Sequence, residues 1–198
     1  MLKKSRLPFF LPVTGTLLLL CWLAACSVQQ TDDNGLSVAL GGGVHYQLQP
    51  PTGSETRVEK VVGTYRGQTQ VLLMQTETTP GHVVLAGLSA SGTRLFSLTF
   101  DGAHLADWQS PLFTAPFRGQ YVLADYQLTH LPLAQAQRGL VAPASLTEQQ
   151  DGSQRIRRLR NATGHEVIRI EYQPRHTRYC HLERDYCLLI EPLNTAAH

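Results

Sequence analysis

Apolar and polar residues alternate along two blocks of this chain, residues 57–109 and residues 145–192. A period of two is typical of strands that bury one face. Turn dipeptides such as Ser91-Gly92 and Asp101-Gly102 separate the alternating runs of the first block, as in antiparallel hairpins. We expect strands at residues 57–66, 69–78, 82–89, 93–101 and 103–109, and then at 145–150, 154–160, 165–172, 176–182 and 185–192. The pattern therefore predicts about ten strands in two meanders.

Between the blocks, residues 118–141 change from alternation to a helical spacing. Their apolar face recurs at intervals of three and four, at Val122, Leu123, Tyr126 and Thr129. Pro132 fits the first turn of a second short helix that carries Leu133. The sequence thus predicts a helical insert between two meanders.

The hairpin around Ser91-Gly92 allows a prediction of which residues share a face. A two-residue turn pairs Leu85 with Leu98 and places Phe96 opposite Gly87. One face then carries Val83, Leu85, Phe96, Leu98 and Phe100. In the second block Ile168 and Ile170 share a face. These faces are candidates either for ordinary core or for a ligand-facing surface.

The first 26 residues have the layout of a secretory signal. A basic segment with Lys3, Lys4 and Arg6 precedes a short apolar core, and Leu23-Ala24-Ala25-Cys26 resembles the lipobox of bacterial lipoproteins. The alternative, an uncleaved transmembrane anchor, is disfavoured because the uninterrupted apolar part is well short of the roughly 20 residues needed to span a membrane. We expect lipidation of Cys26. Ser27 in place of Asp after the cysteine implies the outer membrane, with the domain facing the periplasm.

Removal of residues 1–25 changes the charge argument. The net charge of +2 comes from 17 basic and 15 acidic residues, and cleavage removes three bases, which leaves 14 against 15. The mature chain is therefore not basic, and nothing favours nucleic-acid binding. Residues 26–43 are predicted to be a lipidated N-terminus and flexible tether, and residues 44–198 a single domain, which we expect to be monomeric.

Two cysteines remain for the folded domain. If Glu183-Arg184 is a hairpin turn, Cys180 and Cys187 face each other across it and can form a disulfide in the periplasm. Two buried thiols are the alternative. The spacing of these cysteines with His176 and His181 does not fit zinc, so we expect no metal site.

Residues 155–160, with the sequence RIRRLR, place arginine on both faces of a predicted strand. One interpretation is a rim that meets lipid phosphates or an acidic partner, because guanidinium suits bidentate phosphate contact. The other is an exposed strand with solvated arginines that protect a sheet edge.

Motifs for catalysis are missing. Residues 87–91, with the sequence GLSAS, fall short of G-x-S-x-G and precede a strand rather than a helix. No phosphate loop, G-x-G-x-x-G or H-E-x-x-H occurs. We therefore expect no enzyme, no catalytic residues and no cofactor.

Over nearly all of its mature length the chain resembles a family of bacterial lipoproteins that is often encoded in aryl-polyene gene clusters. More remotely it resembles LolB, the outer-membrane receptor that accepts lipoproteins from a periplasmic carrier. The similarity rests on residues 87–92 (GLSASG), 98–102 (LTFDG), 123–128 (LADYQL) with Pro132, and 167–172 (VIRIEY). The chain departs from the family at Leu131, where an aromatic residue is expected, and its loop at residues 79–81 is not apolar as in LolB-like proteins.

The resemblance implies a LolB/LolA-like open antiparallel β half-barrel, mainly β, with helices covering an apolar concave face. We expect a non-enzymatic outer-membrane lipoprotein that binds or transfers a lipoprotein acyl chain or an aryl-polyene-type lipid, with a LolA-like carrier as a partner. The alternatives are a ligand-free scaffold lipoprotein and a lipid hydrolase. The candidate cavity residues are Val83, Leu85, Phe96, Leu98, Phe100, Leu123, Tyr126, Leu133, Ile168 and Ile170.

Overall fold

The computed structural model describes residues 36–113, 115 and 118–194. The chain from Asp33 to His198 forms one compact unit, and the structure is mainly β, with 55% strand. Its strands are β1 Ser37–Gly41, β2 Val44–Gln47, β3 Glu55–Tyr65, β4 Gln68–Thr79, β5 His82–Leu88, β6 Arg94–Phe100, β7 Leu105–Gln109, β8 Ser145–Asp151, β9 Gln154–Arg160, β10 Glu166–Tyr172, β11 Thr177–His181 and β12 Tyr186–Asn194. Its helices are α1 Gly119–His130 and α2 Leu133–Arg138.

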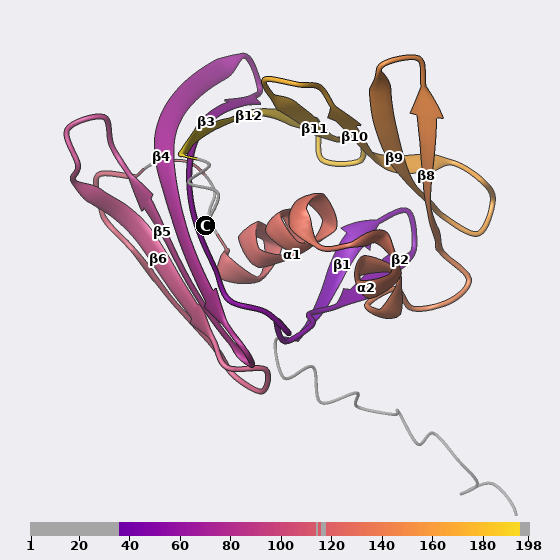
Figure 1. The fold of residues 1–198 in the computed structure, drawn as a ribbon, viewed down its shortest axis with the longest axis horizontal. Coiled ribbons are helices and arrows are strands. Elements are labelled where there is room, and N and C mark those ends of the chain that lie inside the picture. Colours follow the sequence, from indigo (N-terminus) through magenta and orange to yellow (C-terminus); the bar gives the residue numbers. More distant parts are fainter. Residues whose placement is uncertain (1–35, 114, 116–117, 195–198) are drawn as a thin grey trace, which may run out of the picture. The chain divides into compact units, whose positions relative to one another are not determined.

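Ten strands form one antiparallel sheet in the order β7-β6-β5-β4-β3-β12-β11-β10-β9-β8. The two predicted meanders are therefore confirmed, with boundaries close to those expected. The first strand of the first meander, β3, pairs with the last strand of the second, β12, and this pairing joins the two meanders. In it Val61 lies opposite Ile190 and Gly63 opposite Leu188. The sheet is curved and does not close into a barrel, and α1 lies within its curve (Figure 1).

From Val83 to Gly87 the register of β5 with β6 is the one predicted, but it shifts between Gly87 and Leu88, so residues 89–93 join the strands in place of the predicted two-residue turn. Leu85 pairs with Leu98, and Phe96 lies opposite Gly87. A β-carbon added to Gly87 would lie 2.3 Å from the Phe96 ring, so the absence of a side chain there is what allows the aromatic ring to lie across the neighbouring strand. The predicted face of this hairpin is buried.

The predicted tether does not extend to residue 43. Residues 37–41 form β1, which pairs with β2, and Val38 and Leu40 are buried with exposed fractions of 0% and 1%. The sequence did not indicate this strand because its apolar and polar residues alternate over only a few positions, beside a glycine-rich run. Residues 1–35, with the predicted signal and Cys26, lie outside the described residues.

The helical insert is confirmed as two helices. Pro132 is the N-cap of α2 rather than a residue of its first turn. Neither of the described helices is long and apolar enough to cross a membrane. The predicted disulfide is also confirmed, since Cys180 and Cys187 are bonded across the β11–β12 hairpin with Cα atoms 4.2 Å apart.

Candidate functional site

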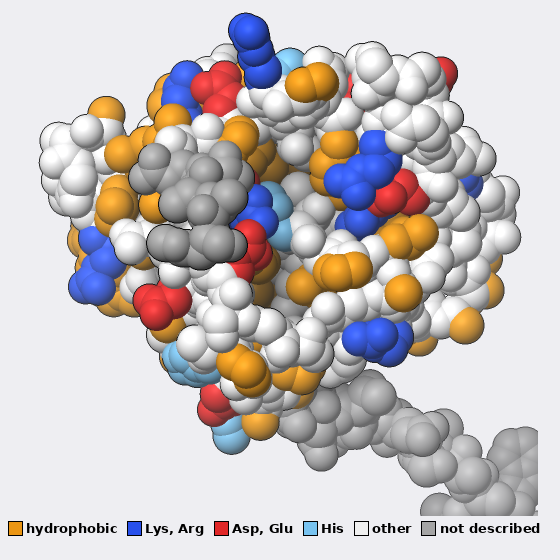
Figure 2. Space-filling view, viewed as in Figure 1, with side chains coloured by type: hydrophobic (Ala, Val, Ile, Leu, Met, Phe, Trp, Pro, Cys, Tyr) orange, Lys and Arg blue, Asp and Glu red, His pale blue; other side chains and the backbone are white. Residues whose placement is uncertain are grey.

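A cavity of about 960 Å³ lies between α1 and the concave face of β3, β4 and β12. We refer to it as the α1 cavity. Figure 2 shows a hollow in this face of the molecule, with basic, acidic and histidine side chains at its border. Its volume lies within the range of small-molecule sites, about 300–1,000 Å³. Its apolar lining consists of Val61, Leu72, Met74, Phe96, Phe113, Val122, Leu188 and Ile190.

The register of the sheet explains why these side chains line one surface. Val61 and Leu72 lie opposite each other on β3 and β4, and Ile190 lies beside Val61 on β12. Alternate residues of each strand point to the same face. The concave face therefore carries apolar rows that run across three strands, and α1 closes part of the space above them.

The middle of α1 is attached to the sheet through Asp125. Tyr179 on β11 donates a hydrogen bond to its carboxylate over 2.5 Å, and Tyr186 on β12 donates to its other oxygen. Burial raises the pKa of Asp125 to about 6, although the two phenols oppose the shift. Burial and the neighbouring Asp125 carboxylate raise the pKa values of Tyr179 and Tyr186, so both stay neutral donors.

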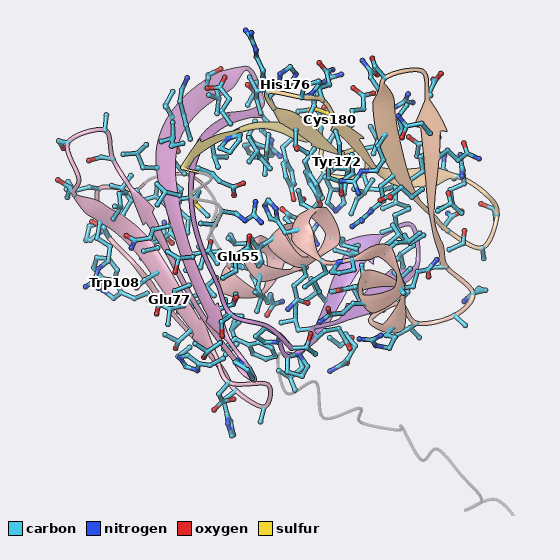
Figure 3. All side chains as sticks on the ribbon, viewed as in Figure 1. Glu55, Glu77, Trp108, Tyr172, His176 and Cys180 are labelled. Carbon is cyan, nitrogen blue, oxygen red and sulfur yellow. A yellow bond between two sulfur atoms is a disulfide. The ribbon has the colours of Figure 1, made fainter. Side chains whose placement is uncertain are left out.

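The C-terminal end of α1 is attached through Arg157 on β9. Its guanidinium donates to the carbonyl oxygens of Leu128 and Leu131 over 2.6 and 3.0 Å and pairs with Glu148 over 2.8 Å. A cation at this end also interacts favourably with the helix dipole. Tyr172, labelled in Figure 3, adds a hydrogen bond of 2.7 Å to the carbonyl of Thr129.

The finding for Arg157 corrects both interpretations of the arginine run at this residue, whereas Arg155 is exposed. Arg157 is neither solvated nor part of a rim, since its exposed fraction is 2%. Arg158 and Arg160 point to the other face and pair with Glu166 over 3.4 and 3.7 Å. Because the helix that Arg157 caps is distant in sequence, the pattern of the strand alone could not indicate a buried guanidinium.

The N-terminal end of α1 meets β7. The backbone N–H of Gly119 donates to the Asp107 carboxylate over 2.7 Å, and a β-carbon at Gly119 would lie 2.7 Å from the same carboxylate. Asp107 thus satisfies a helix N–H that has no partner within the helix. Helix α1 is held at both ends and in its middle, and the α1 cavity lies on its side toward β3 and β4.

One end of the α1 cavity contains a buried acid. Glu59 on β3 has an exposed fraction of 5%. Its oxygens lie 3.2 Å from Nε2 of His130 and 3.6 Å from Nη1 of Arg57. Tyr126 stands beside them, with its ring 4.8 Å from that of His130, and burial raises its pKa to about 12. This end offers a carboxylate within a largely apolar surface.

The opposite end carries three arginines. Arg66 follows β3, Arg118 precedes α1, and Arg184 lies in the β11–β12 turn. The Arg184 guanidinium stacks on the Tyr121 ring at 3.6 Å and donates to the Ala39 carbonyl over 2.5 Å. Within the part of the chain that the structure describes, no carboxylate lies within 4.0 Å of these three guanidinium groups.

The candidate residues from the sequence divide between cavity and core. Phe96 and Tyr126 line the α1 cavity. Leu133 packs against the core from α2. The remaining candidates are buried core residues that do not line the cavity: Val83, Leu85, Leu98, Phe100, Leu123, Ile168 and Ile170.

Sequence reasoning missed the polar residues of the cavity, Glu59, His130 and Arg184 among them. Glu59 did carry a signal, since it shares the strand face of Val61 and stands where alternation predicts an inward side chain. His130 and Arg184 carried none, because their positions depend on how α1 and the β11–β12 turn meet.

The lining of the α1 cavity is suited to binding an amphiphile. No serine or cysteine occurs among the described residues that line the α1 cavity, and no group of three or more potential metal ligands is found among the described residues. An apolar surface with polar groups at two ends binds an amphiphile by burial of its chain and by hydrogen bonds at its polar groups.

Two sequence comparisons bear on identity. No curated protein matches the chain. A family model with the description "Protein of unknown function (DUF3261)" matches residues 56–194. The match begins at the second residue of β3 and ends at the last residue of β12, so it covers the whole ten-stranded sheet and the helical insert. The chain therefore belongs to this family.

Proposed function

We propose that this chain is a non-enzymatic lipoprotein of the outer membrane, anchored through Cys26 and facing the periplasm, that binds an amphiphile in the α1 cavity. The observation that carries the proposal is the cavity itself, about 960 Å³ and partly open, between the concave sheet face and a firmly attached helix. A cavity of this size in a domain of this length is well beyond a packing defect.

The chemistry of the lining supports an amphiphile. Leu72 and Val122 offer an apolar surface along the cavity, and Met74 continues it to the Glu59 end. Each methylene buried there contributes about 0.8 kcal/mol. Polar side chains at the ends match polar groups of a ligand. A lipoprotein acyl chain or an aryl-polyene-type lipid, delivered by a LolA-like carrier, fits this description.

Transfer requires that ligand exchange leave the fold intact. The contacts of Asp125 and Arg157 attach α1 to β9, β11 and β12, whereas the cavity lies between α1 and β3, β4 and β12. We propose that α1 stays in place and that the ligand enters beside it. In this account α1 is a fixed wall.

The test uses two tryptophan substitutions on adjacent residues of β4. Leu72→Trp places an indole in the cavity, and Val71→Trp places one on the opposite, exposed face of the same strand. Binding of a fluorescent fatty acid by the full chain should be lost in Leu72→Trp and kept in Val71→Trp. Equal binding by both variants, with both folded, would place the ligand elsewhere.

A scaffold lipoprotein remains the second candidate, and one observation favours it. Trp108 on β7 is 45% exposed on an edge strand of the sheet and lies on its outer side (Figure 3). Exposed aromatic residues are common in interfaces. If Trp108→Ala abolished a co-purified protein partner while no amphiphile was ever bound, the scaffold would replace the ligand-binding proposal.

A further inference from the structure

Strand β3 runs from one polar end of the α1 cavity to the other, since Glu59 lies on it and Arg66 follows its last residue, Tyr65. Glu59 at one end and Tyr65 at the other both line the cavity from β3. They are six positions apart, which corresponds to about 20 Å at ~3.3 Å per residue. An extended peptide spans about 1.2 Å per chain atom, so a chain of about 16 atoms reaches from one end to the other.

The Glu59 end has unused capacity to accept hydrogen bonds. A carboxylate has about four lone-pair sites, and the contacts to Glu59 are one imidazole nitrogen at 3.2 Å and one guanidinium nitrogen at 3.6 Å. Because Glu59 is 5% exposed, water competes poorly for the remaining sites. A ligand group that ends here gains most if it donates a hydrogen bond.

The arginine end has the opposite preference. Arg66, Arg118 and Arg184 lie on three separate segments and have no carboxylate within 4.0 Å among the described residues. Three acids also line this end of the cavity. Asp125 accepts from two tyrosines, Glu183 pairs with His165 over 3.1 Å, and Asp185 is exposed. The guanidinium groups therefore keep donors for a carboxylate, which they bind in a bidentate geometry.

Between the ends the lining is mainly apolar, and its polar exception on β4 is Gln70, which lies opposite Gly63. Val61, Leu72, Leu188 and Ile190 form the sheet side, and Val122 forms the helix side. An apolar chain can occupy this stretch because it has no polar groups that need hydrogen-bond partners. The order along the cavity is acid, apolar surface, arginines.

From this order we infer that the α1 cavity selects a long-chain amphiphile with a hydroxyl at one end and a carboxylate at the other. The inference rests on the proposed function and names the ligand class. The hydroxyl lies at Glu59 and donates to its carboxylate, and the carboxylate lies at the arginines. A single-headed fatty acid leaves the Glu59 end without a donor.

A competition experiment tests this ligand class with the full chain. Equimolar ω-hydroxyhexadecanoate, hexadecanoate and the corresponding diol are added together, and native mass spectrometry of the protein released from detergent gives the ratio of adducts. A hydrogen bond to a charged group contributes enough for about a tenfold preference. We expect the hydroxy acid to exceed each of the other two probes by about tenfold.

Substitutions at each end of the α1 cavity test which end recognises the hydroxyl group and which recognises the carboxylate. Glu59→Leu should abolish the preference for hydroxy acid over hexadecanoate, and Arg118→Gln should reduce the preference over the diol. The matched controls are Glu77→Leu and Arg178→Gln, on the outer face of the sheet, which should keep both preferences. Glu59→Gln is the milder substitution if Glu59→Leu does not fold, and it should weaken the first preference.

The outcomes separate this inference from the proposed function. Equal adducts of all three probes on the wild-type chain would overturn the inference and leave amphiphile binding intact. A hydroxyl preference that survives Glu59→Leu in a folded protein would also overturn it. Failure of every probe to bind would contradict the proposed function itself.

Discussion

The guanidinium of Arg157 donates a hydrogen bond of 2.6 Å to the backbone carbonyl of Leu128. Leu128 belongs to α1, which precedes α2 in the sequence, and Arg157 belongs to β9, which follows it. Their contact fixes the C-terminal end of α1 above the sheet. Arg157 is also the largest fully buried side chain of the described core. Its position makes α1 a wall of the α1 cavity rather than a free cover.

Removal of Arg157 should therefore destabilise the fold. Arg157→Met leaves the Glu148 carboxylate and the carbonyls of Leu128 and Leu131 without their buried donor, and breaking a buried ion pair costs about 3–5 kcal/mol. Urea unfolding measures the loss. Arg178→Met, which removes an exposed pair with Glu171 at 3.9 Å, should cost less than about 1 kcal/mol. Similar losses in both variants would contradict this account of Arg157.

The Asp125 carboxyl should make stability depend on pH in an unusual direction. Its pKa is raised to about 6 by burial, so the folded chain binds a proton that the unfolded chain releases between about pH 4 and pH 6. Stability from this group is fully present below the unfolded pKa near 3.8 and is lost as pH rises through about 6. Tyr179, Tyr186 and Arg184 are the groups that face it.

The variant Asp125→Asn isolates this effect because it cannot titrate. The free energy of unfolding of the wild type relative to the variant should rise by about 2 kcal/mol between pH 7 and pH 4. Asp101, whose pKa is lowered by backbone hydrogen bonds from His104 and Ala103, is the opposite case. Its contribution is lost only as pH falls below the ordinary value near 3.8, so the difference between the wild type and Asp101→Asn should stay nearly constant between pH 7 and pH 4. A flat difference for Asp125 would show that its carboxyl is not desolvated.

Adding even one methyl group at Gly87 should destabilise the fold. In Gly87→Ala the new methyl would meet the Phe96 ring at 2.3 Å, so this ring, which lines the α1 cavity, must move. Overpacking of this kind costs about 1–3 kcal/mol, and amphiphile binding should weaken as well. Gly53→Ala, where a β-carbon meets nothing within 4 Å, serves as the control in thermal unfolding and binding. If the two variants behave alike, the Phe96 contact does not constrain the fold.

The disulfide should contribute to stability and to the shape of the arginine end. The bond between Cys180 and Cys187 closes a short loop with a sequence separation of 7, for which chain entropy gives about 2–3 kcal/mol. The double variant Cys180→Ser, Cys187→Ser should lose about this amount in urea unfolding. Because Arg184 and Asp185 of the same turn line the cavity, ligand affinity should also fall. Wild-type affinity in the double variant would show that the hairpin keeps its shape without the bond.

The strands could be predicted because their signal is local. In β5 and β6 the turn signal at residues 91–92 predicts which residues pair from Val83 to Gly87, and alternation then predicts which side chains face inward. The same reasoning gave the pairing of Cys180 with Cys187. Helix α1 was found because its apolar spacing differs from that of its neighbours.

The site could not be predicted to the same extent because it depends on non-local contacts. The pairing of β3 with β12 brings Val61 next to Ile190, and no local pattern indicates which edges of two meanders will join. The buried positions of Glu59 and Arg157 follow from where α1 lies over the sheet. Candidates chosen as apolar inward residues were therefore mostly core, and only Phe96 and Tyr126 line the cavity.

The central claim is that the α1 cavity holds an amphiphile. Native mass spectrometry of the full chain, extracted from its own membranes in a mild detergent and compared with Leu72→Trp, tests it most directly. We predict a wild-type mass increased by a bound long-chain amphiphile and a Leu72→Trp mass without it. A wild-type protein that never carries such an adduct, from its own membranes or after reloading, would contradict the claim.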